Sequence, residues 1–241
     1  MQDRYVGDIG DFGKLGILRF VARSNLRIGV NWYLVPNESH NADGKYIDYL
    51  CDKRFKGCDD ELLSALLCIV ASERRSITSL EAAGLVPNAK YYSTTLYPPK
   101  TIGALTRNEW HSSALRTLEG TDIVFLDPDN GLIVQSVGTG SSKSIKYILT
   151  DELRDYYRAG HSVIFYNHRS RQTENDYLER FRKIRNDLAF EGAEWFGLKF
   201  VRRTIRDYIF ILQPGHAAVV KAMTKSFLDS RWGRHSVHLV I

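Results

Sequence analysis

Two carboxylates and an amide, from Asp127, Asp129 and Asn130, directly follow the apolar residues 123–126. Such groups can accept hydrogen bonds from an amine, coordinate Mg²⁺ or act as a general base. Pro128 and the Asn130-Gly131 pair favour a turn, so the preceding segment must end here. The alternative is an ordinary acidic turn, because loops carry Asp, Asn and Gly for conformational reasons alone.

The segment before this cluster predicts a strand buried on both faces, because its four consecutive apolar residues include β-branched and aromatic types. In open α/β sheets, ligands bind just outside the carboxyl ends of the strands. Two other predicted strands also end in polar residues. Residues 27–35 precede Glu38 and His40, and residues 162–166 precede Asn167 and His168. If the three strands are neighbours, these side chains share one crevice with the acidic cluster.

A glycine-rich, charged segment near the N-terminus is the second candidate. Residues 7–16 carry glycine at every third position, interleaved with Asp8, Asp11 and Lys14. We expect Asp11 to cap the helix that follows, and the glycines to let the backbone approach a ligand closely. The spacing matches neither the dinucleotide-binding fingerprint nor a P-loop. A tight entry turn is the alternative, but the three charged residues favour a ligand site.

Arg169 and Arg171 follow the third predicted strand and suit phosphate recognition, because a guanidinium group matches phosphate oxygens bidentately. His168 beside them is a candidate phosphate or substrate contact, with a structural loop histidine as the alternative. The formal net charge of +5 and the pI near 9.0 lean mildly towards phosphate-bearing partners.

The length of 241 residues and the ordinary composition predict one α/β domain, residues 1–241. We expect a mostly parallel sheet with helices on both faces and an antiparallel pair formed by residues 195–201 and 208–212. The three cysteines, Cys51, Cys58 and Cys68, include no C-x-x-C pair, and we expect buried free thiols instead of a metal site or a disulfide. Without an apolar leader or a long apolar run, the expected location is the cytoplasm, with no membrane partner. The oligomeric state stays open.

Residues 7–18, Gly-Asp-Ile-Gly-Asp-Phe-Gly-Lys-Leu-Gly-Ile-Leu, resemble the signature Gly-Asn-x-Ala-Asp-x-x-Lys-His-x-x-Leu. That signature belongs to the J-type bacterial large-subunit rRNA adenine-N6 methyltransferases. Residues 124–129 are similar to that family's Asp-Pro-Pro-Tyr strand end. The late antiparallel pair resembles the terminal hairpin of class I S-adenosylmethionine-dependent methyltransferases.

The resemblance implies a Rossmann-like fold, S-adenosylmethionine as cofactor, and RNA or another nucleotide-containing substrate. Asp127 would accept a hydrogen bond from the target amine, and the Pro128 carbonyl would orient that amine. The catalytic candidates are thus Asp127, Pro128, Asp129, Asn130 and His168. The cofactor-binding candidates are Asp8, Asp11, Lys14 and Glu38. Arg169 and Arg171 are the candidates for substrate phosphate.

Two departures from that family leave a binding protein as an alternative. The glycine loop would fall at residues 35–41, where the chain has no glycine until Gly44. Asp129 and Asn130 replace Pro-Tyr, which removes the aromatic side chain that stacks on adenine. A stacking platform is worth about 1–3 kcal/mol per base. A non-catalytic nucleotide- or RNA-binding protein on a degenerate methyltransferase fold therefore competes with the enzyme.

Residues 124–132 also resemble the Asp-x-Asp motif of haloacid-dehalogenase-like phosphohydrolases. There the first Asp is the nucleophile and the second the general acid, and Mg²⁺ holds the phosphate. Asp8 and Asp11 would supply metal ligands, and Lys14 or Arg169 would hold phosphate. Gly131 stands where that family has Thr. The acidic motif with Asp8 and Asp11 precedes residues 124–132, whereas that family has its acidic motif after the Asp-x-Asp residues. A Mg²⁺-dependent phosphohydrolase or nuclease is the third hypothesis.

Overall fold

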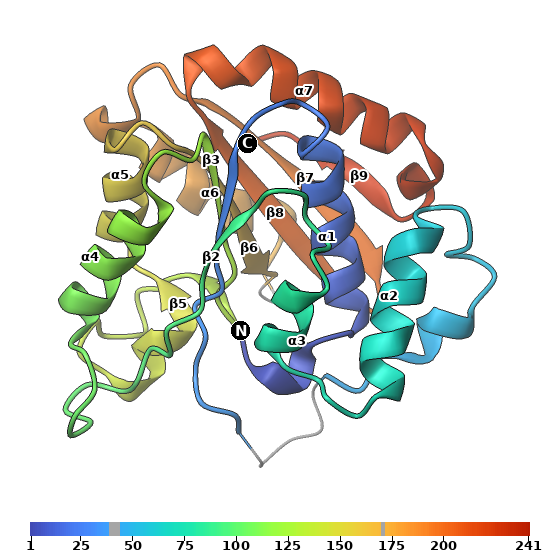
Figure 1. Cartoon of the computed structure of the whole chain (residues 1–241). Coiled ribbons are helices and arrows are strands. Elements are labelled where there is room, and N and C mark those ends of the chain that lie inside the picture. The colour runs from blue at the N-terminus through green and yellow to red at the C-terminus, as the bar shows by residue number, and fades with distance from the viewer. Residues whose placement is uncertain (39–43, 170–171) are drawn as a thin grey trace.

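The architecture is a sheet between two layers of helices. The computed structural model describes residues 1–38, 44–169 and 172–241, and in these the main sheet has the order β2-β1-β3-β6-β8-β7-β9 (Figure 1). Its strands are β1 (Ile28–Asn31), β2 (Lys90–Tyr92), β3 (Ile123–Leu126), β6 (Ser162–His168), β7 (Glu194–Arg202), β8 (Thr204–Leu212) and β9 (Ser236–Leu239). Strands β2, β1, β3 and β6 are parallel, whereas β8 is antiparallel to β6 and β7. The predicted fold class is confirmed.

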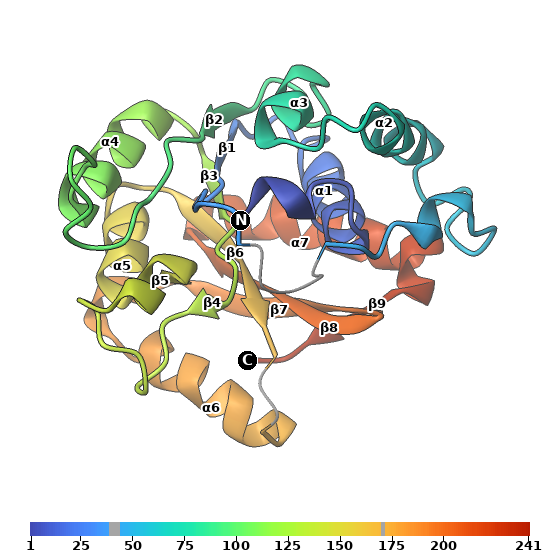
Figure 2. The same ribbon diagram turned by 90° about the horizontal axis from the view of Figure 1, so that it is seen from below.

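Two hydrophobic cores explain the layers, which Figure 2 shows from below. Along β3, Ile123 and Phe125 point into one core, and Val124 and Leu126 point into the other, as the two-residue period of a strand requires. The first core is covered by α1 (Ile9–Val21), α2 (Asp60–Ala71), α3 (Ile77–Ala82) and α7 (Pro214–Asp229). The second is covered by α4 (Arg107–Leu118), α5 (Thr150–Arg158) and α6 (Glu174–Arg185). A strand enclosed in this way must be apolar throughout.

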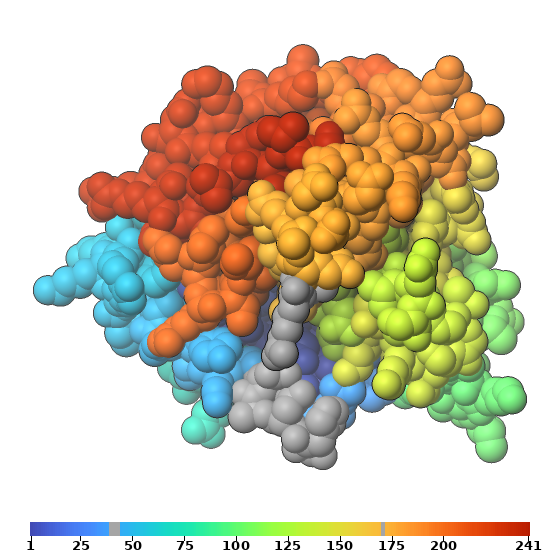
Figure 3. Space-filling view, turned by 180° about the vertical axis from the view of Figure 1, so that it is seen from behind, coloured from blue at the N-terminus to red at the C-terminus, as the bar shows by residue number. Residues whose placement is uncertain are grey.

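The three strands with polar carboxyl ends are neighbours. Strand β3 lies between β1 and β6, with Leu126 opposite Asn31 on one side and Phe165 on the other. Strand β1 is shorter than its apolar pattern predicts, because Tyr33 has a left-handed φ of 44° and its N–H donates to the Asn31 side chain. In Figure 3, the dark-blue N-terminal residues are visible between the orange β7–β8 hairpin and the yellow-green residues after β3.

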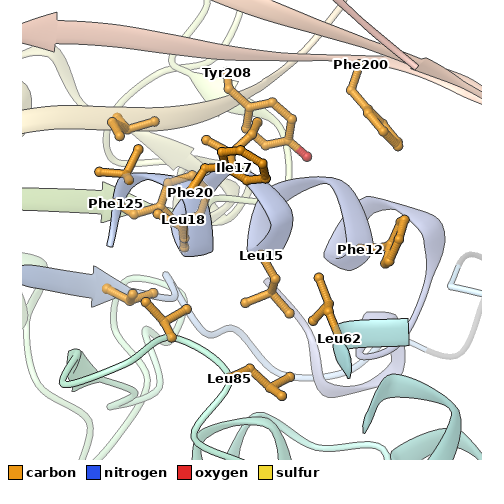
Figure 4. Close-up of a cluster of buried hydrophobic side chains, with 14 of the residues drawn as sticks. Phe12, Leu15, Ile17, Leu18, Phe20, Leu62, Leu85, Phe125, Phe200 and Tyr208 are labelled. Atoms are coloured by element: carbon orange, nitrogen blue, oxygen red, sulfur yellow. The ribbon is translucent and has the colours of Figure 1, made fainter. Parts of the chain in front are cut away.

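Helix α1 is almost wholly buried, and Figure 4 shows its apolar side chains within the first core. Two of its glycines, Gly13 and Gly16, serve packing. A Cβ added at Gly13 would lie 3.1 Å from Phe200, and one added at Gly16 would lie 2.4 Å from Trp232. Only glycine lets the helix approach the aromatic residues that cover this face. The expectation that these glycines bring the backbone towards a ligand is wrong for Gly13 and Gly16.

The cap of α1 also differs from the prediction. Asp8, not Asp11, is the N-cap residue, and its Oδ1 accepts hydrogen bonds from the amides of Gly10 at 2.7 Å and Asp11 at 3.1 Å. Asp11 lies in the first turn, where its Oδ2 accepts from the Gly7 amide at 2.7 Å. Aspartates three residues apart both suit a helix start, so local sequence does not separate them.

The predicted burial of the cysteines is wrong. Cys51 and Cys68 are exposed and Cys58 is partly buried. On α2, Leu62, Leu66 and Ile69 occupy the inner face, which leaves Cys68 on the outer one. In the described residues, no helix has both the length and the apolar character needed to cross a membrane.

Candidate functional site

A cavity of about 490 Å³ opens at the carboxyl ends of β3 and β6. Its wall comes from the start of α1, the turn after β3, the end of β6 and the beginning of β8. The predicted site residues that line it are Asp8, Asp11, Lys14, Glu38, Asp127, Pro128, Asp129, Asn130 and His168. The prediction that the two motifs converge on one cleft is therefore confirmed, although they are more than 100 residues apart in the sequence.

Lys14 joins the two motifs through a buried ion network. Its Nζ lies 2.8 Å from Asp11 Oδ1 and 2.5 Å from Asp127 Oδ2, and the side-chain exposures are 7%, 1% and 3%. Burial by itself lowers the pKa of Lys14, but the two carboxylates outweigh burial and raise it above its ordinary value. The ammonium group therefore stays charged, and α1 is tied electrostatically to the end of β3.

Burial acts in the opposite direction on the carboxylates. It raises the pKa of Asp127 above the usual range, against the lowering effect of Lys14. Burial, and then the charge of Asp11, likewise raise the pKa of Asp8. Although Asp127 directly follows the last residue of β3, its side chain is not exposed like that of an ordinary turn residue. Asp127 is 2% exposed and takes part in a buried ion pair.

The first two residues of the chain hold the acidic turn. The ammonium group of Met1 donates to the carbonyls of Tyr33 at 2.9 Å and Asp127 at 3.0 Å, and lies 2.8 Å from Asp129 Oδ1. Gln2 donates to Asp129 Oδ2 at 2.6 Å. Burial by itself raises the pKa of Asp129, but the adjacent ammonium group and Gln2 bring it below its usual value. The carboxylate of Asp129 is therefore used in holding the turn.

Asn167 fixes the far side of the turn. Its side-chain oxygen accepts from the Leu132 amide at 2.8 Å, which positions the short strand β4 (Gly131–Leu132). Gly131 has a φ of 103°, and a Cβ there would lie 2.1 Å from that oxygen. The adjacent His168 amide donates to the Asn130 carbonyl at 3.1 Å. A side chain at position 131 would therefore clash with Asn167.

The cavity rim carries further charges. Glu38 forms ion pairs with Lys146 at 2.5 Å and with Arg4 at 3.5 Å. His168 is exposed at the end of β6, and its Nδ1 lies 3.3 Å from the Tyr166 hydroxyl. Lys146 belongs to the short turn before β5 (Tyr147–Ile148), a segment in which the sequence contains no motif.

Tyr166 and Arg206 are among the cavity residues that sequence reasoning missed. Tyr166 follows the Leu126–Phe165 pair in register, so it lies beside Asp127 on the adjacent strand. Tyr5, Tyr46 and Tyr208 also line the cavity, which therefore has aromatic walls despite the missing tyrosine of the turn. Residues 202–206 are rich in arginine, which could have drawn attention to Arg206. That Arg206 lies near α1, however, depends on the order of the strands in the sheet.

Arg169 is not among the cavity-lining residues, which is against its predicted phosphate role. It forms an ion pair at 2.9 Å with Asp207, whose side chain is fully buried, and a second one with Glu174. A buried carboxylate needs such a countercharge. Arg171 and His40, the other arginine and histidine candidates, lie outside the described residues.

The cavity wall mixes charges of both signs. Its acids are Asp8, Asp11, Glu38, Asp127 and Asp129, and its cations are Lys14, Lys146, Arg206 and the Met1 ammonium group. Within the described residues, no three His, Cys, Asp or Glu side chains are grouped so that they could hold a metal ion. Several of these charges pair with one another across the wall: Lys14 with Asp11 and Asp127, the Met1 ammonium group with Asp129, and Lys146 with Glu38.

Comparisons with known proteins show a distant structural likeness. No family model matches the chain, and no curated protein matches it. Among solved structures, the chain is similar to protein LPL1258 from Legionella pneumophila, which is described by the family model DUF519. The TM-score is 0.48 at 10% identity, over 98% of this chain and 97% of that one. A likeness at this level does not establish a shared activity.

Proposed function

We propose that the cavity binds S-adenosylmethionine and that the protein transfers its methyl group to an amine of a nucleotide-containing substrate, RNA being one candidate. The observation that carries the proposal is the position of Asp127. It stands at the carboxyl end of the central parallel strand, where α/β sheets bind ligands, and it lines a cavity of about 490 Å³. Cavities of about 300–1,000 Å³ are typical of small-molecule sites.

The charges of the wall favour this ligand over a phosphate. S-adenosylmethionine carries a sulfonium cation, an ammonium cation and one carboxylate. These groups match a wall that has both acidic and basic side chains. A phosphohydrolase needs Mg²⁺ between its acidic motif and the phosphate. Here the Lys14 ammonium group lies between Asp11 and Asp127, where that cation would be needed. This arrangement disfavours the phosphohydrolase hypothesis.

Individual side chains of the cavity wall have roles in this proposal. Bound S-adenosylmethionine would supply a methyl group on a positively charged sulfur. Asp127 accepts an N–H hydrogen bond from the target amine, since Oδ2 is used by Lys14 and Oδ1 has no donor among the described residues. This hydrogen bond would orient the amine lone pair towards the methyl group, and transfer would form the N–C bond, leave the C–S electron pair on sulfur and release one amine proton to water. Tyr166, beside Asp127, lines the cavity and is the candidate to stack on a flat base.

A thermal-shift panel tests the proposal, because a ligand that binds the native state raises the melting temperature. We expect a rise with S-adenosylmethionine and S-adenosylhomocysteine, and none with Mg²⁺ alone or with Mg²⁺ plus ATP. Transfer of radiolabelled methyl to RNA oligonucleotides and to adenine nucleotides then tests catalysis. A rise only with Mg²⁺ and nucleotide would refute the proposal in favour of a phosphohydrolase. A rise with S-adenosylmethionine but no transfer to any acceptor would favour a binding protein.

A further inference from the structure

One guanidinium group in the cavity has an unused hydrogen-bonding edge. Arg206 lies on β8 and is 8% exposed, yet it lines the cavity. Its Nη1 donates to the carbonyls of Arg202 at 3.1 Å and Thr204 at 3.2 Å, which fixes the side chain. In the described part of the chain, its Nε has no acceptor, and Nη2 has only Asp8 Oδ2, at 3.7 Å. That distance is too long for a hydrogen bond.

Asp8 is the complementary group. Its Oδ1 caps α1, while Oδ2 meets only Arg206 among the described residues. A Cβ added at Gly10 would lie 2.7 Å from Arg206 Nε, so glycine here allows the guanidinium to rest on the first turn of the helix. A carboxylate and a guanidinium group therefore lie side by side on the wall, each with polar atoms left over.

We propose that Arg206 and Asp8 bind the amino-acid end of the ligand: Arg206 pairs with its α-carboxylate and Asp8 Oδ2 with its α-ammonium group. A guanidinium edge with two parallel N–H donors matches a carboxylate bidentately. This inference rests on the proposed function, since it assigns one end of the same cavity to the aminocarboxypropyl group of S-adenosylmethionine. The adenosine end of the ligand contacts the other residues of the cavity wall.

Two ligands separate the two ends of the cavity. S-adenosylhomocysteine carries the amino-acid group, whereas 5′-methylthioadenosine has the same adenosine and thioether without it. Calorimetric titration of the wild-type protein and of Arg206→Met with both ligands tests the assignment. We expect Arg206→Met to weaken S-adenosylhomocysteine about 10- to 100-fold, the usual worth of a charged hydrogen-bond pair, and to leave 5′-methylthioadenosine within about twofold.

Two further variants and a control sharpen the test. Arg206→Lys keeps the charge but loses the planar fork, so an intermediate loss is expected. Asp8→Asn keeps an N-cap oxygen while removing the charge, so it should also weaken only S-adenosylhomocysteine. Arg203→Met, at an exposed position of the same hairpin, should bind both ligands as the wild type does. Circular dichroism checks that each variant is folded.

The outcomes distinguish the two proposals. If the wild-type protein binds neither ligand, the proposed function fails and this inference fails with it. If it binds both, but Arg206→Met weakens them equally or leaves S-adenosylhomocysteine unchanged, the inference alone is wrong. Selective loss of S-adenosylhomocysteine in both Arg206→Met and Asp8→Asn supports the assignment.

Discussion

Replacing Lys14 by Met tests whether the buried ion network holds the site together. Methionine has a similar length, so the change mainly removes the charge. Asp11 and Asp127 would then face each other without the cation that now lies 2.8 and 2.5 Å from them. Removing one partner of a buried pair costs about 3–5 kcal/mol. That is a large share of the roughly 5–15 kcal/mol by which a domain is usually stable.

A double-mutant cycle with Asp127→Asn isolates the electrostatic part of the stability lost in Lys14→Met. Asp127→Asn alone should cost less, about 1–3 kcal/mol, because Lys14 keeps Asp11 and the amide oxygen still accepts a hydrogen bond. In the Lys14→Met background, Asp127→Asn should restore stability, since it removes one of two uncompensated carboxylates. Urea unfolding monitored by tryptophan fluorescence gives each free energy, provided that the m-value is unchanged.

The pH dependence gives an independent check. Without Lys14, the folded pKa of Asp127, which burial already raises, should rise further. A carboxyl group whose folded pKa is raised contributes stability below its unfolded pKa and loses it as pH rises through the folded pKa. Lys14→Met should therefore be less destabilising at pH 5 than at pH 8. A cost below about 1 kcal/mol, or a double variant as unstable as the sum of the singles, would refute the reasoning.

Three other predictions follow from particular contacts. Asp127→Asn should lower methyl transfer but leave part of it, because the single amide oxygen can accept from the target amine only when it is turned away from Lys14; a wild-type rate would remove Asp127 from the mechanism. Gly16→Ala should destabilise by about 1–3 kcal/mol through contact with buried Trp232, while Gly215→Ala, which meets open space, should be neutral in the same urea assay. Burial lowers the pKa of His161. The stability that neutral His161 contributes is therefore complete above its unfolded pKa of about 6.5 and is lost as pH falls through its folded pKa. His161→Gln should make the free energy of unfolding depend less on pH when it is measured from pH 7 to 5.

Much of the fold was determined by local sequence. The apolar runs before Asp127 and Asn167 predict strands enclosed on both faces, and both runs are buried strands of the central sheet. Parallel strands place their carboxyl ends at one edge, so polar residues distant in sequence could be expected to meet there. Periodicity and turn residues suffice for this, because the burial of each strand depends on its own composition.

Only the tertiary structure decided which charges are partners. Lys14 and Asp127 are 113 residues apart, and their pairing depends on α1 packing against the sheet. The same packing explains the glycines of α1, because Phe200 and Trp232 leave no room for a side chain at Gly13 and Gly16. The spacing of the glycines does not reveal these two neighbours. Arg169 and Arg206 are both arginines near strand ends, yet one neutralises the buried Asp207 and the other faces the cavity. Residue type and spacing cannot distinguish them, because the role of a charge is set by the burial and the partners that the fold gives it.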